Sequence, residues 1–355
     1  MCFEIWVFTA LNSLSNPEDI KIGFESTAHY ALNLELFLEN AHHSFMEVNP
    51  VLIKEYKKST TLRRTKTDSV DCESIARWLI TVEYKPHSKG FYHAYSLKSL
   101  TRLRDRLIRQ RSFYLVKITN VLDHTFPEFK PFFNERLSKT ALYLLENYGS
   151  AEKMARMNSA SYDKLRCISR GKFSIQQFLR LKELAANTVG VNNSIFDLEL
   201  NTLLTLYKSL SDEINTLETE IIKLIEEVHP HYMSIPGIGP ISSAVIYAEY
   251  GDISNFSNPG QMLAFAGIEP GINDSGTESH GGRMVKHGSS QLRYVLLNAC
   301  LPLIRFDLTF ATYYEKKRAE GKKHRVAITH VAKKLIRVIY ALERQDVDFN
   351  AQKLR

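Results

Sequence analysis

The chain lacks the features that mark secreted, disulfide-bonded and membrane-spanning proteins. Its 355 residues include four cysteines, which lie far apart and form no C-x-x-C pair. This distribution argues against a zinc knuckle or a disulfide framework and suits a reducing cytoplasm. No apolar run approaches the roughly 18 to 20 residues that a membrane span needs. The start, "MCFEIWVF", has no basic segment and no cleavage site of a signal peptide. We therefore expect a cytoplasmic protein with no membrane partner.

The basic residues, in contrast, are plentiful and unevenly distributed. The formal net charge is +7. One segment holds Arg102, Arg104, Arg106, Arg109 and Arg111, and a second holds Lys316, Lys317, Arg318, Lys322, Lys323 and Arg325. Separated basic stripes are typical of a nucleic-acid footprint, because they neutralise a phosphate backbone. Solvated helix faces are the alternative interpretation of each stripe taken alone.

The N-terminal part shows a strand–helix–strand pattern. Residues 19–25, "DIKIGFE", predict a strand that ends in the carboxylate Glu25. "STAHYALNLELFLENA" follows with helical spacing and with Ser26 or Thr27 as its N-cap. "HSFMEVNP" predicts a second strand, which stops at Asn49-Pro50. This order predicts a right-handed crossover and a parallel sheet. From about residue 66 the chain is expected to be mostly helical.

A heptad pattern marks the middle of the chain. The spacing alternates between four and three residues at Leu210, Ile214, Leu217, Ile221, Leu224 and Val228. Such a seam is typical of a coiled coil that pairs two chains. An intramolecular helical hairpin explains so few heptads equally well. Pro and Gly in "HPHYMSIPGIGP" then indicate a domain boundary near residue 230.

Two aspartates follow a basic run in "RRTKTDSVDCESIARWLI". Asp68 and Asp71 are three residues apart, which places both carboxylates on one face of a helix. They can be first-turn residues beside an N-cap at Thr67 or Asp68. They can also join Glu25, at the carboxyl end of a parallel strand, in a magnesium site for phosphoryl transfer. Phosphates would then be held by the preceding basic residues Arg63, Arg64 and Lys66.

A glycine-rich turn precedes the C-terminal region. In "SIPGIGPISSAVIYAEY", P-G-I-G is followed by a helix of small apolar residues, as in a helix-hairpin-helix. Gly237 and Gly239 permit a tight turn, and free N–H groups at the start of the next helix can hold a DNA phosphate. A plain turn between two core helices is the alternative.

Residues 265–299 read as a loop or hairpin followed by a helix. Ser275 lies in the turn sequence N-D-S-G, and Lys286, His287 and Arg293 follow it. A serine nucleophile needs a base or electropositive surroundings, and a phosphate target needs donors for its oxygens. Taken by itself, however, N-D-S-G is more often an ordinary turn than a nucleophile.

These segments, in this order, resemble the DEDD-type insertion-sequence transposases of the family numbered 110 and its 1111 relatives. The matching pieces are "GFESTAHY", "VNP", "RRTKTDSVDCESIARWL", "PGIGPISSAVIYAEYGDISNFSNPGQMLAFAGIEP" and "SGTESHGGRMVKHGSSQLRYVLLNA". They extend over about residues 12–345. Because they are spread over two domains, their combination is far more specific than any single motif.

The resemblance implies an α/β plus all-α protein. It divides the chain into a RuvC-like, ribonuclease-H-type domain with an incomplete sheet (1–125), a helical linker with a coiled coil (126–230), a mostly helical transposase domain with a helix-hairpin-helix (231–345) and a tail (346–355). It also implies covalent DNA strand exchange, a structured guide RNA, double-stranded DNA as substrate, a dimeric or tetrameric assembly and a place at the nucleoid.

The resemblance further assigns site residues. The acidic tetrad of the family would include Glu25, Asp68 and Asp71 with Mg²⁺, and the serine nucleophile would be Ser275. The residue patterns described before the resemblance add expected nucleic-acid contacts from Arg63, Arg64, Lys66, Arg102, Arg106, Arg109, Gly237, Gly239, Lys286 and Arg293.

The front of the chain departs from the family pattern. Family members open with a "G-I-D" strand whose aspartate is the first metal ligand, whereas this chain opens with "MCFEIWVFTALNSLSNPEDI". We therefore expect a truncated or frame-disrupted copy whose three carboxylates bind metal poorly.

Whether the chain is an active enzyme thus stays open between two functions. It is either a transposase/recombinase or a decayed nucleic-acid-binding remnant that competes with intact copies by assembling with them. A Holliday-junction nuclease is a weaker third function, because a plain metal nuclease needs no serine.

Overall fold

The computed structural model describes residues 20–25, 31–61, 67–84, 91–134, 137–275, 278–284, 286 and 288–354. For residues 91–93, 270–275, 278–283 and 353–354 it describes only the backbone. By its internal contacts the chain forms two compact units, which are treated separately below. One unit comprises residues up to Leu97 together with Pro230–Ile238 and Val245–Arg355, and the other comprises Lys98–His229 and Gly239–Ala244. The predicted domain limits at 125, 230 and 345 stay predictions.

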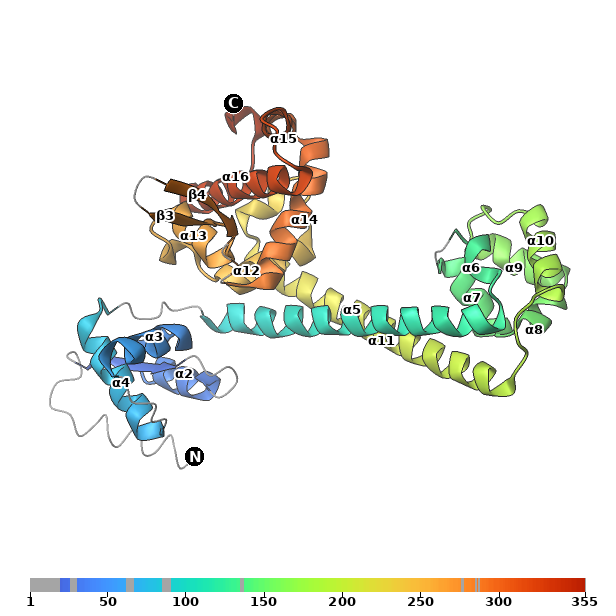
Figure 1. Cartoon of the computed structure of the whole chain (residues 1–355), viewed down its shortest axis with the longest axis horizontal. Helices are drawn as coiled ribbons and strands as arrows, with labels where there is room; N and C mark the ends of the chain where they lie inside the picture. The colour runs from blue at the N-terminus through green and yellow to red at the C-terminus, as the bar shows by residue number, and fades with distance from the viewer. Residues whose placement is uncertain are drawn as a thin grey trace. The chain divides into compact units, whose positions relative to one another are not determined.

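The N-terminal elements confirm the predicted strand–helix–strand order. Strand β1 (Ile22–Glu25), helix α2 (Ala31–Asn40) and strand β2 (Phe45–Val48) follow one another, in blue in Figure 1. The two strands are parallel, and Glu25 pairs in register with Val48. The expected N-cap residues of α2, Ser26 and Thr27, lie outside the described residues.

A helix after β2 was not predicted. Asn49-Pro50 ends the strand, as expected, but it also starts helix α3 (Pro50–Thr60). The Asn49 side chain accepts a hydrogen bond from the Val51 N–H at 2.9 Å, and Pro50 occupies the first helical position. Both features favour a helix start, because proline there loses no helical hydrogen bond and asparagine satisfies an orphan donor. The prediction that the chain turns mostly helical from about residue 66 therefore missed this helix.

Helix α4 (Asp68–Thr81) packs against β1 and α3. A small core joins Val48, Ile53 and Leu79. Tyr84, just after the helix, places its hydroxyl 3.1 Å from the Ile22 carbonyl oxygen and 2.9 Å from that of Ser44. One phenol thus ties together the starts of both strands, and its burial raises the pKa of Tyr84.

The second unit is built around two long helices of 35 residues each, α5 (Phe91–Thr125), which belongs to it from Lys98 on, and α11 (Ser194–Val228). Between them come α6 (Phe129–Phe132), α7 (Lys139–Tyr148), α8 (Ala151–Ala155), α9 (Ser159–Ile168) and α10 (Ile175–Ala186). Figure 1 shows these short helices gathered beyond the ends of the two long ones. Their core includes buried Phe129, Leu145 and Leu165, onto which the end of α5 packs through Leu122.

The heptad seam of α11 lies inside this unit. Ile214 and Ile221 are buried, and Leu210, Leu217 and Leu224 are partly buried. The Arg104 guanidinium of α5 donates to Glu218 of α11, with N–O distances of 2.8 and 2.5 Å. These contacts favour the intramolecular packing of the seam over pairing of two chains, and a coiled coil between chains stays a prediction.

The C-terminal elements are mostly helical. They are η3 (His231–Ser234), α12 (Pro240–Tyr250), η4 (Ile253–Asn255), α13 (Pro259–Ala266), β3 (Pro270–Ser275), β4 (Glu278–Met284), α14 (Ser290–Phe306), α15 (Leu308–Ala319), α16 (His324–Gln345) and η5 (Ala351–Leu354). Helix α16 is central and contacts α13, α14, α15 and η3. Its apolar face is fully buried at Val331, Leu335 and Ile339.

The architecture is thus helical with small sheets, as expected for an α/β plus all-α chain. Within the described residues the parallel sheet has two strands and the hairpin β3–β4 forms the other sheet. The RuvC-like character of the first region stays a prediction. Among the described helices no single one is long and apolar enough to span a membrane, and the pair α14 and α15 passes that test only when taken together across a bend of 106°.

Candidate catalytic and nucleic-acid-binding sites

Asp68 and Asp71 lie in the first turn of α4, as their spacing predicts. Thr67 is the N-cap, and its hydroxyl accepts a hydrogen bond from the Val70 N–H at 3.4 Å. Carboxylates in this turn interact favourably with the helix dipole. Asp68 is exposed, whereas Asp71 is partly buried and forms an ion pair with Lys57 of α3.

The ion pair with Lys57 makes the Asp71 carboxylate less available as a metal ligand. The Lys57 ammonium sits where a cation would neutralise the carboxylate, so a metal ion would have to displace it. No group of three or more His, Cys, Asp or Glu side chains in the described part of the chain lies close enough to hold a metal ion. The expected cluster of Glu25, Asp68 and Asp71 is therefore not gathered into a three-ligand site. The segment expected to lack the first ligand, residues 1–19, lies outside the described residues.

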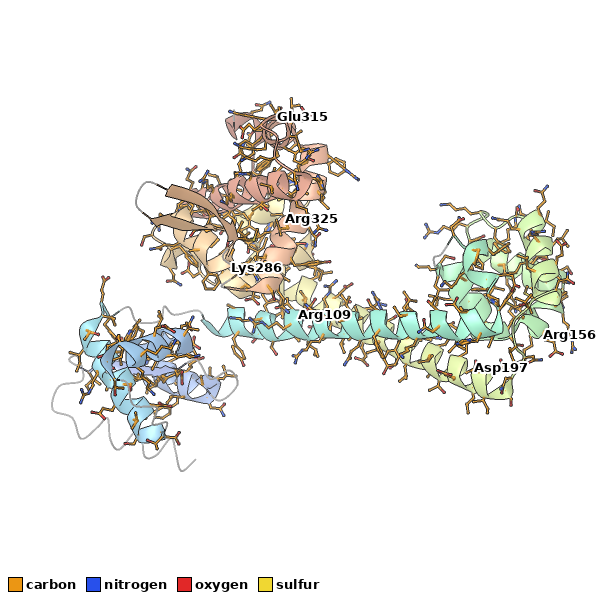
Figure 2. The ribbon with its side chains drawn as sticks, in the orientation of Figure 1. Arg109, Arg156, Asp197, Lys286, Glu315 and Arg325 are labelled. Carbon is orange, nitrogen blue, oxygen red and sulfur yellow. The ribbon has the colours of Figure 1, made fainter. Side chains whose placement is uncertain are left out.

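The predicted arginine stripe of α5 has two kinds of member. Arg102 and Arg106 are exposed, and Arg109 is exposed while paired with Asp105 at 2.8 Å (Figure 2). Arg104 instead binds Glu218 and holds α11. One arginine of the stripe thus packs α5 against α11, and the exposed ones place positive charge on the surface. The three basic residues before Asp68, Arg63, Arg64 and Lys66, lie outside the described part of the chain.

The P-G-I-G turn uses its two glycines differently. Gly237 has φ of +95°, and a Cβ there would lie 2.7 Å from Pro302 Cγ and 3.2 Å from the Ala299 carbonyl oxygen of α14. The positive φ and the close contact both exclude a side chain at Gly237, so this glycine permits the turn to pack closely against α14. Gly239 directly precedes Pro240, the first residue of α12, and an added Cβ would meet nothing within 4 Å. A phosphate contact from the α12 N-terminus stays a prediction. The element before the turn is the short 3₁₀ helix η3, so the helix-hairpin-helix also stays a prediction.

The region around Ser275 is a β-hairpin, one of the two arrangements predicted from the sequence. Strands β3 and β4 are antiparallel, with Ser275 opposite Glu278 at the tip. The backbone places Ser275 at the end of its strand, next to residues 276–277, which are not described. Lys286 follows the hairpin and is exposed (Figure 2).

Arg293 of α14 is bound by its own chain. Its Nη1 donates to the carbonyl oxygens of Ala266, at 3.1 Å, and Gly288, at 3.2 Å. Ala266 ends α13, so the guanidinium satisfies an orphan helix carbonyl. Gly288 approaches α13 so closely that a Cβ there would lie 2.1 Å from the Phe265 carbonyl oxygen. Arg293 therefore positions the segment that follows the hairpin, a role that sequence spacing does not reveal.

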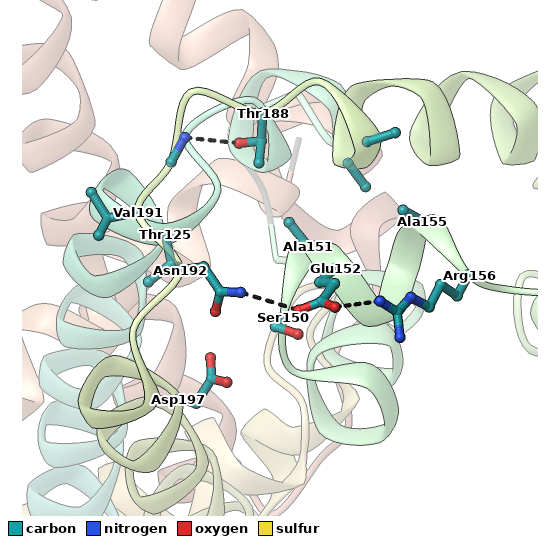
Figure 3. Close-up of a pocket in the computed structure, with 13 residues that line it drawn as sticks. Thr125, Ser150, Ala151, Glu152, Ala155, Arg156, Thr188, Val191, Asn192 and Asp197 are labelled. Atoms are coloured by element: carbon teal, nitrogen blue, oxygen red, sulfur yellow. Dashed lines mark hydrogen bonds and ion pairs between the residues drawn. The ribbon is translucent and has the colours of Figure 1, made fainter.

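A cavity of about 320 Å³ lies in the helical part of the second unit (Figure 3). Its polar groups bind one another: Glu152 accepts from Arg156 at 2.5 Å and from Asn192 at 3.1 Å. Nearby, Glu128 accepts from the Thr188 hydroxyl at 2.6 Å. These bonds hold the segment before α11 against the shorter helices. The polar groups at the cavity therefore have a structural role.

Two groups without a predicted role stand out near α16. His231 lies between Asp348 and Asp346, with ring N–O distances of 3.0 and 2.9 Å, and these bonds raise the pKa of His231. The second group is His330 of α16, whose pKa is lowered first by burial and then by the charge of Lys317. Lys333 and Lys322 lower the pKa further, and Glu320 opposes them.

Comparison with known proteins identifies the family. A model described as "Transposase", for the DEDD transposases of IS110, matches residues 7–127. A second, "Transposase IS116/IS110/IS902 family", matches residues 230–315. The chain belongs to the IS110 family of insertion-sequence transposases. The family resemblance read from the sequence is thereby confirmed.

Three relatives illustrate the similarity. An uncharacterized 43.6 kDa protein of insertion element IS110 from Streptomyces coelicolor is 27% identical over 66% of this chain and 60% of its own length. An uncharacterized 42 kDa protein of insertion element IS900 from Mycobacterium paratuberculosis is 28% identical over 79% of this chain and 71% of its own. The transposase of IS1111A from Coxiella burnetii is 25% identical over 73% of this chain and 59% of its own. The chain thus spans about three fifths of the length of two of these relatives.

Proposed function

We propose that the chain is a DNA transposase/recombinase of an insertion sequence, which exchanges DNA strands through a covalent protein–DNA intermediate. The observation that carries the proposal is the order of the two family matches, residues 7–127 and 230–315. The second match includes the hairpin with Ser275 at its tip. Ser275 is the proposed nucleophile.

The proposed chemistry is a pair of transesterifications. The Ser275 hydroxyl oxygen forms a bond to a DNA phosphorus, the bond from that phosphorus to a deoxyribose oxygen breaks, and the hydroxyl proton passes to the leaving oxygen through a base or solvent. A hydroxyl of the second strand then attacks the same phosphorus and releases the serine. The number of phosphodiester bonds is conserved, so no external energy source is required.

Nucleic-acid partners follow from the same proposal. Double-stranded DNA of the element ends and of the target would be held by phosphate contacts, for which exposed Arg102 and Arg106 on α5 are suitable. A structured guide RNA and a homo-oligomeric assembly, dimer or tetramer, are further parts of it, and the nucleoid would be the site of action. These parts rest on the resemblance alone.

Magnesium dependence is proposed with Glu25, Asp68 and Asp71 as ligands. Bound there, Mg²⁺ would neutralise charge that develops on the phosphate. The support is the position of Glu25 at a strand end and of both aspartates in one helix turn. The pairing of Asp71 with Lys57 opposes it.

A second candidate function is a nucleic-acid-binding remnant without catalysis. The observation that favours it is the same Lys57–Asp71 pair, together with the lack of a gathered three-ligand site in the described residues. Such a chain would keep the exposed arginines of α5 and the hairpin, and it would bind DNA without exchanging strands.

One experiment separates the two. The full chain is incubated with Mg²⁺, RNA from the element and labelled duplexes that carry the element ends and a target, and covalent adducts are resolved on a denaturing gel. If the chain is a transposase, covalent adducts should form, and they should be lost when a chelator is added and in Ser275→Ala. The duplex affinity of Ser275→Ala should equal that of the wild type. Ser279→Ala, which changes the other serine of the hairpin, serves as the matched control.

Each outcome decides between the candidates. Adducts that persist in Ser275→Ala would remove this serine from the mechanism. Salt-dependent duplex binding without any adduct would establish the remnant, because electrostatic binding does not require chemistry.

A further inference from the structure

A hollow of about 340 Å³ lies between α15 and α16. Its volume is at the lower end of the roughly 300 to 1,000 Å³ typical of ligand pockets. The lining residues are Leu308, Thr309, Thr312, Tyr313, Lys316 and Lys334. Lys316 belongs to the second basic segment of the sequence, and the other five belong to none of the predicted sites.

The ammonium of Lys334 is held at this hollow by aromatic rings. It lies 5.1 Å from the centroid of Phe310 and 5.2 Å from that of Tyr313. Burial lowers the pKa of Lys334, and the negative charge of Asp307 opposes this effect. An ammonium that has lost part of its water in this way gains from an anionic partner.

The other lining side chains come mainly from one face of α15. Leu308, Thr312 and Lys316 follow one another at intervals of four residues, which align on a helix. Leu308 is 70% exposed, although it is a large apolar side chain. Within the described residues, neither Lys316 nor Lys334 forms an ion pair. The hollow therefore combines two cations, hydroxyl groups, a tyrosine ring and an exposed apolar surface.

This combination matches one nucleotide of an unpaired strand. Ammonium and hydroxyl groups bind a phosphate, and a base packs its face against an aromatic or apolar surface. A duplex offers its phosphates in the same way, but its bases are stacked on each other and their faces are covered. An unpaired strand therefore makes both contacts, whereas a duplex makes only the first.

We propose that the hollow between α15 and α16 binds one nucleotide of a single strand, with its phosphate at Lys316 and Lys334 and its base against Tyr313 and Leu308. The proposal rests on the proposed function, because strand exchange and guide pairing both present unpaired strands. RNA and DNA share this chemistry, and the test below distinguishes them.

The test uses the full chain and fluorescence anisotropy. The probes are labelled single strands of about 15 nucleotides, oligo-U and oligo-dT, which match typical single-strand site sizes, and a duplex of equal length. The variants are Tyr313→Leu, Lys334→Met and Lys316→Ala. Lys164→Ala removes an equal charge from an exposed position on α9 and is the matched control.

Each pocket variant should weaken binding of the tighter single strand by about tenfold, in line with the loss of one stacked base or one phosphate contact. Tyr313→Leu should leave duplex binding near the wild type, because a duplex makes no base contact in the hollow, whereas the lysine variants also remove a phosphate contact that a duplex can make. Lys164→Ala should leave binding of every probe near the wild type. The ratio of oligo-U to oligo-dT affinity identifies the strand. Melting curves check folding, and Lys316→Ala remains informative in any case because Lys316 is exposed.

The contrary results are distinct. If single-strand affinity is unchanged in folded variants, or if Tyr313→Leu lowers duplex affinity equally, the hollow is not a nucleotide pocket and the proposed function is unaffected. If the wild-type chain binds neither single strand nor duplex, both proposals fail. As a second measurement, photocrosslinking with oligo-5-iodouracil should label Tyr313, and labelling elsewhere only would contradict the assignment.

Discussion

The ammonium of Lys57 on α3 is paired with the carboxylate of Asp71 on α4. Neither side chain is fully buried, with 24% and 26% of their surfaces exposed. An ion pair of this kind contributes under about 1 kcal/mol to stability. Its larger consequence is functional, because the lysine competes with any metal ion for the aspartate that the family resemblance assigns to the metal site.

Lys57→Met should therefore increase the affinity for a divalent cation. The substitution keeps the apolar stem of the side chain, removes its charge and frees the Asp71 carboxylate. We expect the Mn²⁺ dissociation constant, measured by titration calorimetry, to fall severalfold, while the melting temperature changes little. Lys54→Met removes an equal charge from an exposed position on the same helix and is the control. An Mn²⁺ affinity that is equal in both variants would contradict a metal-binding role for Asp71.

The two glycines of the P-G-I-G turn should differ sharply in their tolerance of substitution. Gly237→Ala combines a positive φ with a contact of 2.7 Å to Pro302, so we expect a loss of about 1 to 3 kcal/mol in unfolding free energy. Gly239→Ala meets neither obstacle and should change stability by less than about 1 kcal/mol. Denaturant unfolding of the two variants checks the difference, and equal losses would show that the packing on α14 is not the cause.

Local patterns in the sequence were sufficient to predict several elements. The parallel strand pair follows from period and turn residues that are close in sequence. The same kind of signal left two residues for the cap of α4, of which Thr67 is the one observed, and two arrangements for the region around Ser275, of which the hairpin is observed. Helix α3 was missed because Asn49-Pro50 serves both to end a strand and to start a helix. Tertiary partners were not predictable, since no spacing rule connects Lys57 to Asp71.

The His231 contacts should make the C-terminal tail sensitive to pH. The bonds to Asp348 and Asp346 raise the pKa of His231 above its ordinary value of 6.5. A group whose pKa is higher in the folded state stabilises that state fully below the unfolded pKa, and the effect is lost as pH rises through the folded pKa. The tail should therefore be held more tightly near pH 6 than near pH 8.5.

Hydrogen exchange of the peptide that contains Phe349 measures this effect, because its N–H donates to Ser234 Oγ at 2.8 Å. Protection should be greater at the lower pH, after correction for intrinsic exchange rates. Glu343, whose pKa is raised by burial, acts in the same direction. His231→Gln isolates the histidine contribution: it should abolish most of the pH dependence, and a variant that keeps the full dependence would assign it to Glu343.

Arg293 permits a test that distinguishes a positioning role from a nucleic-acid contact. Its guanidinium bonds to Ala266 and Gly288 join the end of α13 to the segment after the hairpin. Hydrogen bonds from a charged donor contribute about 1.5 to 3 kcal/mol, so Arg293→Ala should destabilise this joint by about that amount. Exchange of the backbone in residues 278–288 should accelerate. The yield of covalent adduct should fall, because the hairpin that carries Ser275 is less well placed, while duplex affinity stays constant.

Arg293→Lys should behave as an intermediate variant, since its ammonium keeps the charge but ends a shorter side chain than the one whose Nη1 makes both bonds. Arg305→Ala removes an exposed arginine from the last turn of the same helix and controls for charge alone. The opposite pattern is equally informative. If Arg293→Ala lowers duplex affinity and its salt dependence but leaves hydrogen exchange unchanged, Arg293 contacts phosphate directly, as the sequence pattern predicts, and the internal bonds do not position the hairpin.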